Sequence, residues 1–395
     1  MNFDDTPQEA AFRATARAWI TANAPRIGHG DDLATAKAWQ KRKAEDGWAC
    51  LNWPPEYGGR GATPMERVIF EQEEGDRLAL AAPFRVGHGI CGPTLMAFAS
   101  EEQKRRHLPP LASGEEIWCQ LFSEPAAGSD LGGLRTRATR DGDHWIVDGQ
   151  KVWTSLAEIA DFGLLLARTD PTAPKHKGLT MFFLDMRSPG VQVRPIKQAS
   201  GHAEFNEVWL TGVRIPDSQR LGRVNEGWTV SLTSLMNERF SIGARLATAV
   251  PEFLEFVSQA PEGVRADDRR VRAQLATWVA RANGLKYTVY RAISAVSRGE
   301  RPGPENSIGK LVAAQMVQEI ATAALDMQGP AGARAREDGA AGKLYQTLFV
   351  SIGRRVAGGT DEIMRNIIAE RVLGLPADIR VDKDVPFEKI PTRGR

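Results

Sequence analysis

Residues 119–161 read CQLFSEPAAGSDLGGLRTRATRDGDHWIVDGQKVWTSLAEIAD, and the rest of the chain is arranged around this stretch. Its first part is a run of small residues in which Ser123 and Ser129 flank two alanines and a glycine. Small side chains let backbone N–H groups approach a ligand closely, and such groups bind phosphate oxygens. The run therefore predicts a loop that holds an anionic ligand.

The second part predicts two short strands, at residues 144–148 and 152–155, joined by a turn at Asp148 and Gly149. Strand alternation would place Trp153 and Ser155 on one face. An aromatic plane beside a hydroxyl suits the ring system of a flavin. The residues alone support equally well an ordinary loop followed by a core tryptophan, because a lone Gly/Ser loop is weak evidence.

The order of these motifs closely resembles the acyl-CoA dehydrogenase flavoprotein family. Members carry an S/T-E-P-x-A-G-S-D run followed by G-x-K-x-W-x-T/S, and the resemblance extends from Phe3 to about Pro376. It implies FAD as the cofactor, an acyl-CoA as the substrate and electron-transfer flavoprotein as the electron acceptor. The runs AGGTDEIMRNIIAERVLGLP and RPGPENSIGK resemble a bacterial branch that includes steroid and other bulky acyl-CoA dehydrogenases, some of them two-plus-two heterotetramers.

Length and composition indicate an ordinary globular protein of two or three domains, with 395 residues and 42% hydrophobic residues. Fifty-one basic and forty-nine acidic residues leave a net charge of +2, which favours neither nucleic acid nor a membrane surface as a partner. Three cysteines without C-x-x-C spacing and six scattered histidines predict no disulfide framework and no metal site. No apolar run reaches the roughly 18 residues of a membrane span, so we expect a cytoplasmic location.

The alternation of helix-like and strand-like patterns predicts an α+β protein, and a β region between two helical regions matches the architecture that the resemblance to acyl-CoA dehydrogenases implies. We expect an N-terminal α-helical domain (1–117), a middle antiparallel β domain (118–224), a C-terminal domain resembling a four-helix bundle (225–376) and a charged, loose tail (377–395). The resemblance also implies a homo-oligomer, a dimer or tetramer, or a heterotetramer with a paralogue.

The usual catalytic base of the family is missing from its expected place. Members remove the α-proton of an acyl thioester with a carboxylate while the β-hydrogen leaves as a hydride, and most place that glutamate directly before a G-T pair. Here Gly358 precedes Gly359 and Thr360. Glycine cannot accept a proton, so either the base lies elsewhere or the chain performs no dehydrogenation. The matched position, Gly358, is expected to border the substrate.

A helix predicted at 228–249 offers a replacement base. Glu238 lies at the margin of an apolar stripe on this helix. The stripe comprises Leu232, Leu235, Met236, Phe240 and Leu246. Some branches, including the isovaleryl and long-chain enzymes, carry their base here in a similar E-R pair. We therefore predict Glu238 as the base and Arg239 as a residue that orients the substrate; the alternative is that Glu238 is a solvated surface residue.

The resemblance assigns cofactor contacts to two regions. In the central stretch it matches Phe122 and Ser123 along the flavin ring, Ser129 toward the pyrophosphate, and Trp153 and Ser155 near N5. Near the C-terminus, where the family reaches a flavin held mainly by a neighbouring subunit, it matches the following residues: Gln328, Gly332, Gly359, Thr360 and Glu362.

Two departures from the family pattern keep other functions open. Residues 258–268 hold no R-x-x-F-G motif, whose arginine meets the pyrophosphate across a subunit interface, and residues 328–332 depart from Q-x-x-G-G. Together with Gly358, these departures are compatible with a non-catalytic or half-site subunit of a heterotetramer. They are also compatible with a flavin oxidase or monooxygenase relative.

Overall fold

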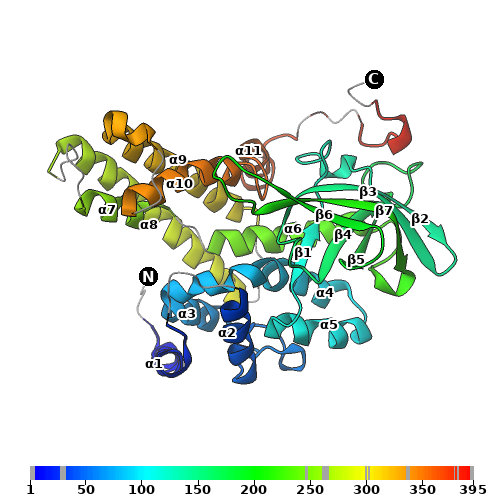
Figure 1. Ribbon diagram of the computed structural model, residues 1–395, viewed down its shortest axis with the longest axis horizontal. Coiled ribbons are helices and arrows are strands. Elements are labelled where there is room, and N and C mark those ends of the chain that lie inside the picture. The colour runs from blue at the N-terminus through cyan, green and yellow to red at the C-terminus, as the bar shows by residue number, and fades with distance from the viewer. Residues whose placement is uncertain are drawn as a thin grey trace. The chain divides into compact units, whose positions relative to one another are not determined.

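The chain divides into two compact units in the computed structural model (Figure 1). Unit 1 comprises residues 1–197, 203–238 and 379–395, and unit 2 comprises residues 198–202 and 239–378. Unit 1 thus contains both the helical and the β region expected in the first part of the chain, while the individual boundaries at 117, 224 and 376 stay predictions. The structure describes the following residues: 5–26, 33–244, 248–259, 267–298, 300, 303–334, 339–377, 379 and 382–391.

Helices begin where the sequence supplies caps. The N-caps Thr6, Thr63 and Ser100 each accept a hydrogen bond from the backbone three residues on, and the side-chain oxygen of the Glu or Gln at that position accepts one from the backbone N–H of the cap. Proline follows two of these caps, at the first helical position. The described helices of unit 1 are α1 (Pro7–Asn23), α2 (Leu33–Glu45), α3 (Pro64–Glu74), α4 (Gly92–Phe98), α5 (Glu101–Ser113) and α6 (Gly227–Ala244) as far as residue 238.

Eight strands in the described part of unit 1 form one sheet in the order β6-β7-β3-β2-β4-β5-β8, with β1 paired to β4. Most neighbouring strands are antiparallel, as predicted, but β1 and β2 each run parallel to β4. The strands are β1 (Trp118–Leu121), β2 (Arg137–Asp141), β3 (His144–Ser155), β4 (Phe162–Arg168), β5 (Leu179–Asp185), β6 (Val191–Ile196), β7 (Phe205–Pro216) and β8 (Arg220–Leu221).

The predicted turn at Asp148 and Gly149 is wrong. β3 runs through both residues as one strand, and its pairing with β7 shifts register twice, between Val147 and Gly149 and between Lys151 and Thr154. A bulge of this kind lets a strand bend without ending. The two short runs in the sequence are therefore halves of one long strand.

Helices cover both faces of the sheet. Alternate residues of β4 point to opposite faces, and they belong to different clusters: Leu165 packs with Trp39 and Phe84 in one, and Leu164 packs with Leu108 in the other. β4 and β5 are buried along nearly their whole length, which explains their continuous apolar sequence. Figure 1 shows α4 and α5 beside this central part of the sheet.

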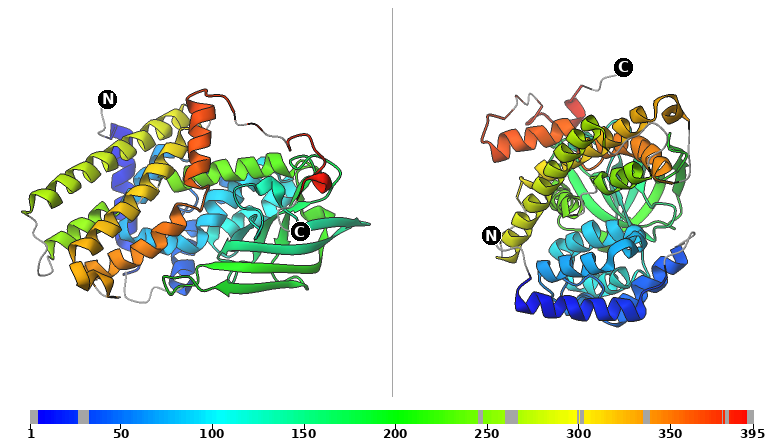
Figure 2. Two further views of the ribbon diagram at one scale, coloured as in Figure 1. Left: turned by 90° about the horizontal axis from the view of Figure 1, so that it is seen from above. Right: turned by 90° about the vertical axis from the view of Figure 1, so that its left-hand side faces the viewer.

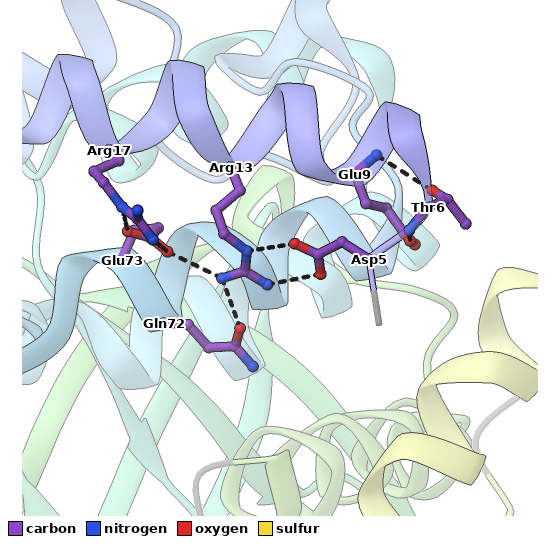
Figure 3. Close-up of polar contacts among 7 residues, drawn as sticks. All are labelled: Asp5, Thr6, Glu9, Arg13, Arg17, Gln72 and Glu73. Atoms are coloured by element: carbon purple, nitrogen blue, oxygen red, sulfur yellow. Dashed lines mark hydrogen bonds and ion pairs between the residues drawn. The ribbon is translucent and has the colours of Figure 1, made fainter. Parts of the chain in front are cut away.

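Ion pairs fix α1 against α3 (Figure 3). The Arg13 guanidinium donates to Asp5 at 2.5 Å and to Glu73 at 3.0 Å, and Arg17 reaches the same Glu73 at 2.8 Å. Hydrogen bonds from Arg17 and Arg13 outweigh burial and hold the pKa of Glu73 below its usual value. Tryptophans Trp19 and Trp48 pack behind these contacts. The N-terminal helix is thereby held by both charge and apolar burial.

Unit 2 is helical. Its described helices share a core built on Phe253, Trp278, Met316, Ile320 and Leu344, and Figure 2 shows the long α8 and α9 packed lengthwise with their neighbours. Apolar residues at helical spacing predict a helix over residues 307–328, and α9 confirms it almost to the residue. The helices are α7 (Val250–Ser258), α8 (Arg269–Ser297), α9 (Asn306–Met327), α10 (Gly339–Arg354) and α11 (Asp361–Ile367).

The three cysteines carry free thiols. Cys91 and Cys119 are buried and Cys50 is half-buried. Burial raises the pKa of Cys50 and of Cys119 to about 12 and raises that of Cys91 strongly. None of the described helices combines the length and the apolar character that crossing a membrane requires.

Candidate functional site

The small-residue run forms a compact loop directly after β1. Glu124 and Ala127 exchange backbone hydrogen bonds of 3.0 Å, which closes a tight turn. The Phe122 side chain is core, so only its backbone can meet a ligand. Ser123 is half-buried and Ser129 is exposed. The loop thus presents backbone and hydroxyl groups, and the buried Phe122 side chain anchors it to the core.

A buried ion pair ties this loop to β3. Lys151 is fully buried and donates to Glu124 at 2.9 Å and to the carbonyls of Phe122 at 3.0 Å and Leu166 at 2.8 Å. The other oxygen contacts of Glu124 come from the backbone N–H groups of Arg135, at 2.6 Å, and Thr136, at 2.9 Å. Every donor of the lysine therefore has an acceptor, which is the condition for keeping a charge in the interior.

Burial disfavours the charged form of both residues, and its effect on the two pKa values differs. Desolvation would raise the pKa of Glu124, yet the charge and hydrogen bond of Lys151 outweigh it and lower that pKa. Desolvation also lowers the pKa of Lys151, against the attraction of Glu124. We call Glu124 and Lys151 the buried latch. The sequence analysis missed it, although both residues lie inside the quoted motifs, because charged residues in such runs are usually expected at the surface.

Trp153 stands out from the sheet two residues beyond the latch. The Val152 N–H donates to the Ser123 carbonyl at 2.9 Å, which joins the strand to the loop. Trp153 has a φ of +60°, in the left-handed region that a bulky residue rarely adopts, and it is 59% exposed. Ser155 is half-buried farther along the strand. Strain of this kind gathers at functional sites, and here it presents a large aromatic ring beside a loop suited to anions.

α6 exposes part of the apolar stripe that the sequence predicted. Leu232 and Met236 of the predicted apolar stripe are 37% and 40% exposed, and the inward face carries the fully buried Ser231 and Ser234 instead. Ser234 shares a hydrogen bond of 2.9 Å with Thr94 on α4. The stripe prediction was wrong for Leu232 and Met236, because small hydroxyl residues occupy the closely packed face, while Leu235 of the stripe packs against the core. The side chains of Phe240 and Leu246, and that of Arg239, lie outside the described residues.

Glu238 itself is half-buried. It follows Ser234 by four residues and Ser231 by seven, spacings that place all three on one face of a helix. Glu238 is therefore placed by helix spacing on the same side of α6 as the buried serines, one turn farther along.

Unit 2 contains a second group of predicted residues around a glycine turn. Gly358 and Gly359 have φ values of +68° and +102°, which favour glycine. Thr360 caps α11 by accepting from the Ile363 N–H at 3.2 Å. Glu362 is exposed in the first turn of the same helix. The turn and the helix start thus form one capped unit.

Buried charges that sequence reasoning missed hold this turn. Lys310, 3% exposed, donates to the carbonyls of Arg355, at 3.2 Å, and Gly359. Asp361, 2% exposed, pairs with the Arg355 guanidinium at 2.6 Å and lies 4.0 Å from the Lys310 ammonium. The sequence did offer one signal for these contacts: Lys310 lies in the buried stripe of α9, and a buried lysine needs hydrogen-bond acceptors.

Gln328 and Gly332 lie at the end of α9. The Gln328 amide donates to the Ala324 carbonyl at 3.0 Å. A Cβ on Gly332 would lie 2.1 Å from the Leu325 carbonyl oxygen, so only glycine fits this turn.

The predicted site residues fall into two groups. The structure places Phe122, Ser123, Ser129, Trp153, Ser155 and Glu238 in unit 1. It groups Gln328, Gly332, Gly358, Gly359, Thr360 and Glu362 in unit 2.

Within the described residues, no group of three or more His, Cys, Asp and Glu side chains is arranged to hold a metal ion.

Three family models match successive parts of the chain: the acyl-CoA dehydrogenase N-terminal domain over residues 6–115, the middle domain over 119–213 and the C-terminal domain over 225–373. The chain belongs to the acyl-CoA dehydrogenase family. It is thus an oxidoreductase of the class that acts on CH–CH donors, and its family is flavin-dependent.

Relatives and solved structures support the bacterial branch. The acyl-CoA dehydrogenase IpdE1 of Mycobacterium tuberculosis is 36% identical over 385 residues, 93% of this chain and 98% of that protein. The acyl-CoA dehydrogenase FadE34 of the same organism is 39% identical over 84% of this chain but only 45% of its own length. The ChsE4-ChsE5 complex from Mycobacterium tuberculosis superposes with a TM-score of 0.81 at 30% identity, covering 96% of this chain and 100% of that chain.

A second solved structure, the Tcur3481-Tcur3483 steroid ACAD, has a TM-score of 0.80 at 29% identity and covers 96% of this chain and 100% of that chain. These likenesses confirm the predicted family and its α+β architecture. In this acyl-CoA dehydrogenase, the exposed Trp153 ring and the small-residue loop suit an aromatic, anionic cofactor. The residues present in unit 1 therefore fit the flavin that the family uses.

Proposed function

We propose that this acyl-CoA dehydrogenase binds FAD and converts an acyl-CoA thioester to the trans-2-enoyl-CoA, with Glu238 as the base. The observation that supports it is the place of Glu238, half-buried on the inward face of α6 one turn beyond Ser234. The other family position for the base is Gly358, which has no side chain to accept a proton. Glu238 is the remaining candidate that the family pattern supplies.

The proposed chemistry assigns one task to each region. Glu238 removes the α-proton, and hydrogen-bond donors near the thioester oxygen stabilise the negative charge that develops there. The bound flavin supplies the acceptor for the β-hydrogen, which leaves as a hydride. The small-residue loop and Ser129 hold the phosphates, Trp153 and Ser155 border the ring, and the buried latch keeps loop and strand in register.

The substrate class and partners are also part of the proposal. Structures of similar chains are named as a steroid ACAD and as the two-component ChsE4-ChsE5 complex, so we propose a bulky, sterol-like acyl group and a paralogous partner chain. Gln328, Gly332, Gly359, Thr360 and Glu362 would then contact a flavin held mainly by the neighbouring subunit. Arg239 and Gly358 would border the acyl group. Electrons would pass to electron-transfer flavoprotein.

Replacement of Glu238 by Gln tests the base. Glu238→Gln should retain FAD but reduce anaerobic flavin bleaching by an acyl-CoA about 10²–10⁴-fold, the usual contribution of a general base. Glu102→Gln, at an exposed position on α5, is the matched control and should behave as the wild type. Bleaching by Glu238→Gln at the wild-type rate would refute the assignment.

Two further measurements separate the alternatives. A colourless, well-folded chain that stays colourless with its paralogue would favour a scaffold subunit without a working flavin. Rapid reaction of the acyl-CoA-reduced enzyme with oxygen, rather than with electron-transfer flavoprotein, would favour an oxidase. A screen of straight-chain, branched and sterol-derived acyl-CoAs by anaerobic flavin reduction tests the substrate class, and bleaching by short straight chains alone would contradict a bulky acyl group.

A further inference from the structure

The last described residues of the chain lie beyond the family match, which ends at residue 373, yet they pack on unit 1. The Phe387 N–H donates to the Ala173 carbonyl at 2.9 Å, and the Glu388 N–H donates to that of Pro171 at 3.0 Å. Pro386 pairs with Pro174 as an isolated bridge. Figure 1 shows this red segment beside the strands of unit 1. The expectation of a loose tail is therefore wrong for residues 382–391, which we call the C-terminal strap.

The first anchor of the strap is the Phe387 ring, which lies over a buried arginine. The Arg168 guanidinium is 3.5 Å from the ring centroid, and Phe387 is 8% exposed. Burial, opposed by Glu124, lowers the pKa of Arg168 to about 10. A guanidinium covered by an aromatic face loses the competing water that would weaken its hydrogen bonds.

Arg168 in turn organises the loop that follows Ser129. Its guanidinium donates to the carbonyls of Gly132 at 2.7 Å, Leu134 at 3.2 Å and Lys175 at 3.2 Å. These carbonyls belong to residues 130–134 and to the β4–β5 connection. One covered side chain therefore fixes two segments that are distant in sequence.

The second anchor is an ion pair shared by the strap and the same loop. The Lys175 ammonium lies 3.0 Å from Asp130 and 2.5 Å from Asp382. The hydrogen bond from Lys175 lowers the pKa of Asp382. Asp130 directly follows Ser129, the residue assigned to the cofactor pyrophosphate. The loop is close-packed here as well, because a Cβ on Gly132 would lie 2.7 Å from the His176 ring.

We infer that the C-terminal strap is a positioning element for the phosphate-binding loop, by which we mean the small-residue run together with residues 130–134, and that it acts through Arg168 and Lys175. This inference rests on the proposed function for the nature of the ligand, the diphosphate of FAD. An anion in this loop needs backbone N–H groups held in place before it arrives, since ordering them on binding would weaken affinity. The strap holds these backbone N–H groups in place, although it lies beyond residue 373, where the match to the family's C-terminal domain ends.

The experiment combines three variants with two readouts. The variants are Phe387→Ala, Asp382→Asn and a chain that ends at residue 377; Lys389→Ala, at an exposed position in the strap, is the matched control. The first readout is hydrogen exchange of peptides that cover residues 129–134, in the flavin-free protein. The second is the dissociation constant of FAD, measured by flavin fluorescence in the assembly that binds it.

We expect exchange to accelerate in all three variants. FAD affinity should fall about 30-fold in Phe387→Ala, which corresponds to the roughly 2 kcal/mol of one desolvated cation–π contact, less in Asp382→Asn and more in the shortened chain. Exchange and affinity within twofold of the wild type in Phe387→Ala and in the shortened chain would overturn the inference. Faster exchange with unchanged affinity would also overturn it, because the strap would then only add stability. The exchange readout needs no flavin, and Glu238→Gln leaves the strap intact, so failure of the proposed chemistry and failure of the strap are distinguishable.

Discussion

Removal of the lysine from the buried latch tests whether the loop and β3 are held as the structure indicates. Lys151→Met leaves a methylene chain of similar length but no charge, and the Glu124 carboxylate, 6% exposed, then keeps only its two backbone donors. Breaking a buried ion pair by removing one partner costs about 3–5 kcal/mol. Because protein domains are stable by only about 5–15 kcal/mol, the loss should be large.

Urea unfolding followed by circular dichroism measures this loss, with Lys41→Met, at an exposed position on α2, as the matched control. The double variant Glu124→Gln with Lys151→Met should recover part of the stability, with an interaction energy of up to about 3 kcal/mol, since it leaves no unpaired charge. A loss below about 1 kcal/mol in Lys151→Met, as for an exposed pair, would refute the reasoning. So would strict additivity of the two single changes.

The same variant has a predicted pH dependence. In the wild type the pKa of Glu124 is lowered, so its contribution is present above the unfolded pKa and is lost as the pH falls through the folded one. Without Lys151, desolvation should raise the pKa of Glu124. The cost of burying the unpaired Glu124 carboxylate is then absent in acid, where the group is protonated, and grows as the pH rises and the group ionises. The stability gap between the two proteins should therefore narrow on acidification. A constant gap would show that the lost stability has another source.

Three further predictions concern other parts of the chain. Glu73→Gln should flatten the acid side of the curve of stability against pH. Arg17 and Arg13 hold the pKa of Glu73 below 4.5, so the contribution of Glu73 to stability is lost as the pH falls through that lower pKa. Thermal unfolding at several pH values checks this, and an acid branch that is the same as in the wild type would contradict it. Trp153→Gly should leave stability within about 1 kcal/mol, because the ring is 59% exposed and glycine accepts a φ of +60°, while flavin retention measured by absorbance should fall. Gly358→Ala should cost about 1 kcal/mol in urea unfolding because of its φ of +68°, and a stabilised variant would argue against that backbone conformation.

Local signals in the sequence predicted much of the fold. The apolar repeat of α9 ends at Met327, next to the stop that Gly329 and Pro330 predict. Residues 163–168 and 179–184 read as short strand-like runs in the sequence, and β4 and β5 lie there. These features depend on neighbours within a few residues, which the sequence displays directly.

Features that depend on distant contacts could not be read in the same way. The bulge beside Trp153 arises from pairing with β7, and the buried Ser234 of α6 is matched by Thr94 on α4. Lys151 pairs with Glu124, 27 residues earlier in the chain, and Arg168 donates to the carbonyl of Gly132, 36 residues earlier. Sequence patterns treat such side chains as surface residues, because they do not show which carbonyls fold back to receive them.

The chemistry of the three thiols has a practical consequence for studying this enzyme. Cys50, Cys91 and Cys119 are protonated at neutral pH, since burial raises the pKa of each. Because maleimide and disulfide reagents attack the thiolate, the native cysteines should label slowly. Two cysteines introduced at exposed positions, one in each unit, could then carry a pair of spectroscopic probes on the otherwise unaltered chain, and the distance between the two units could be measured in solution.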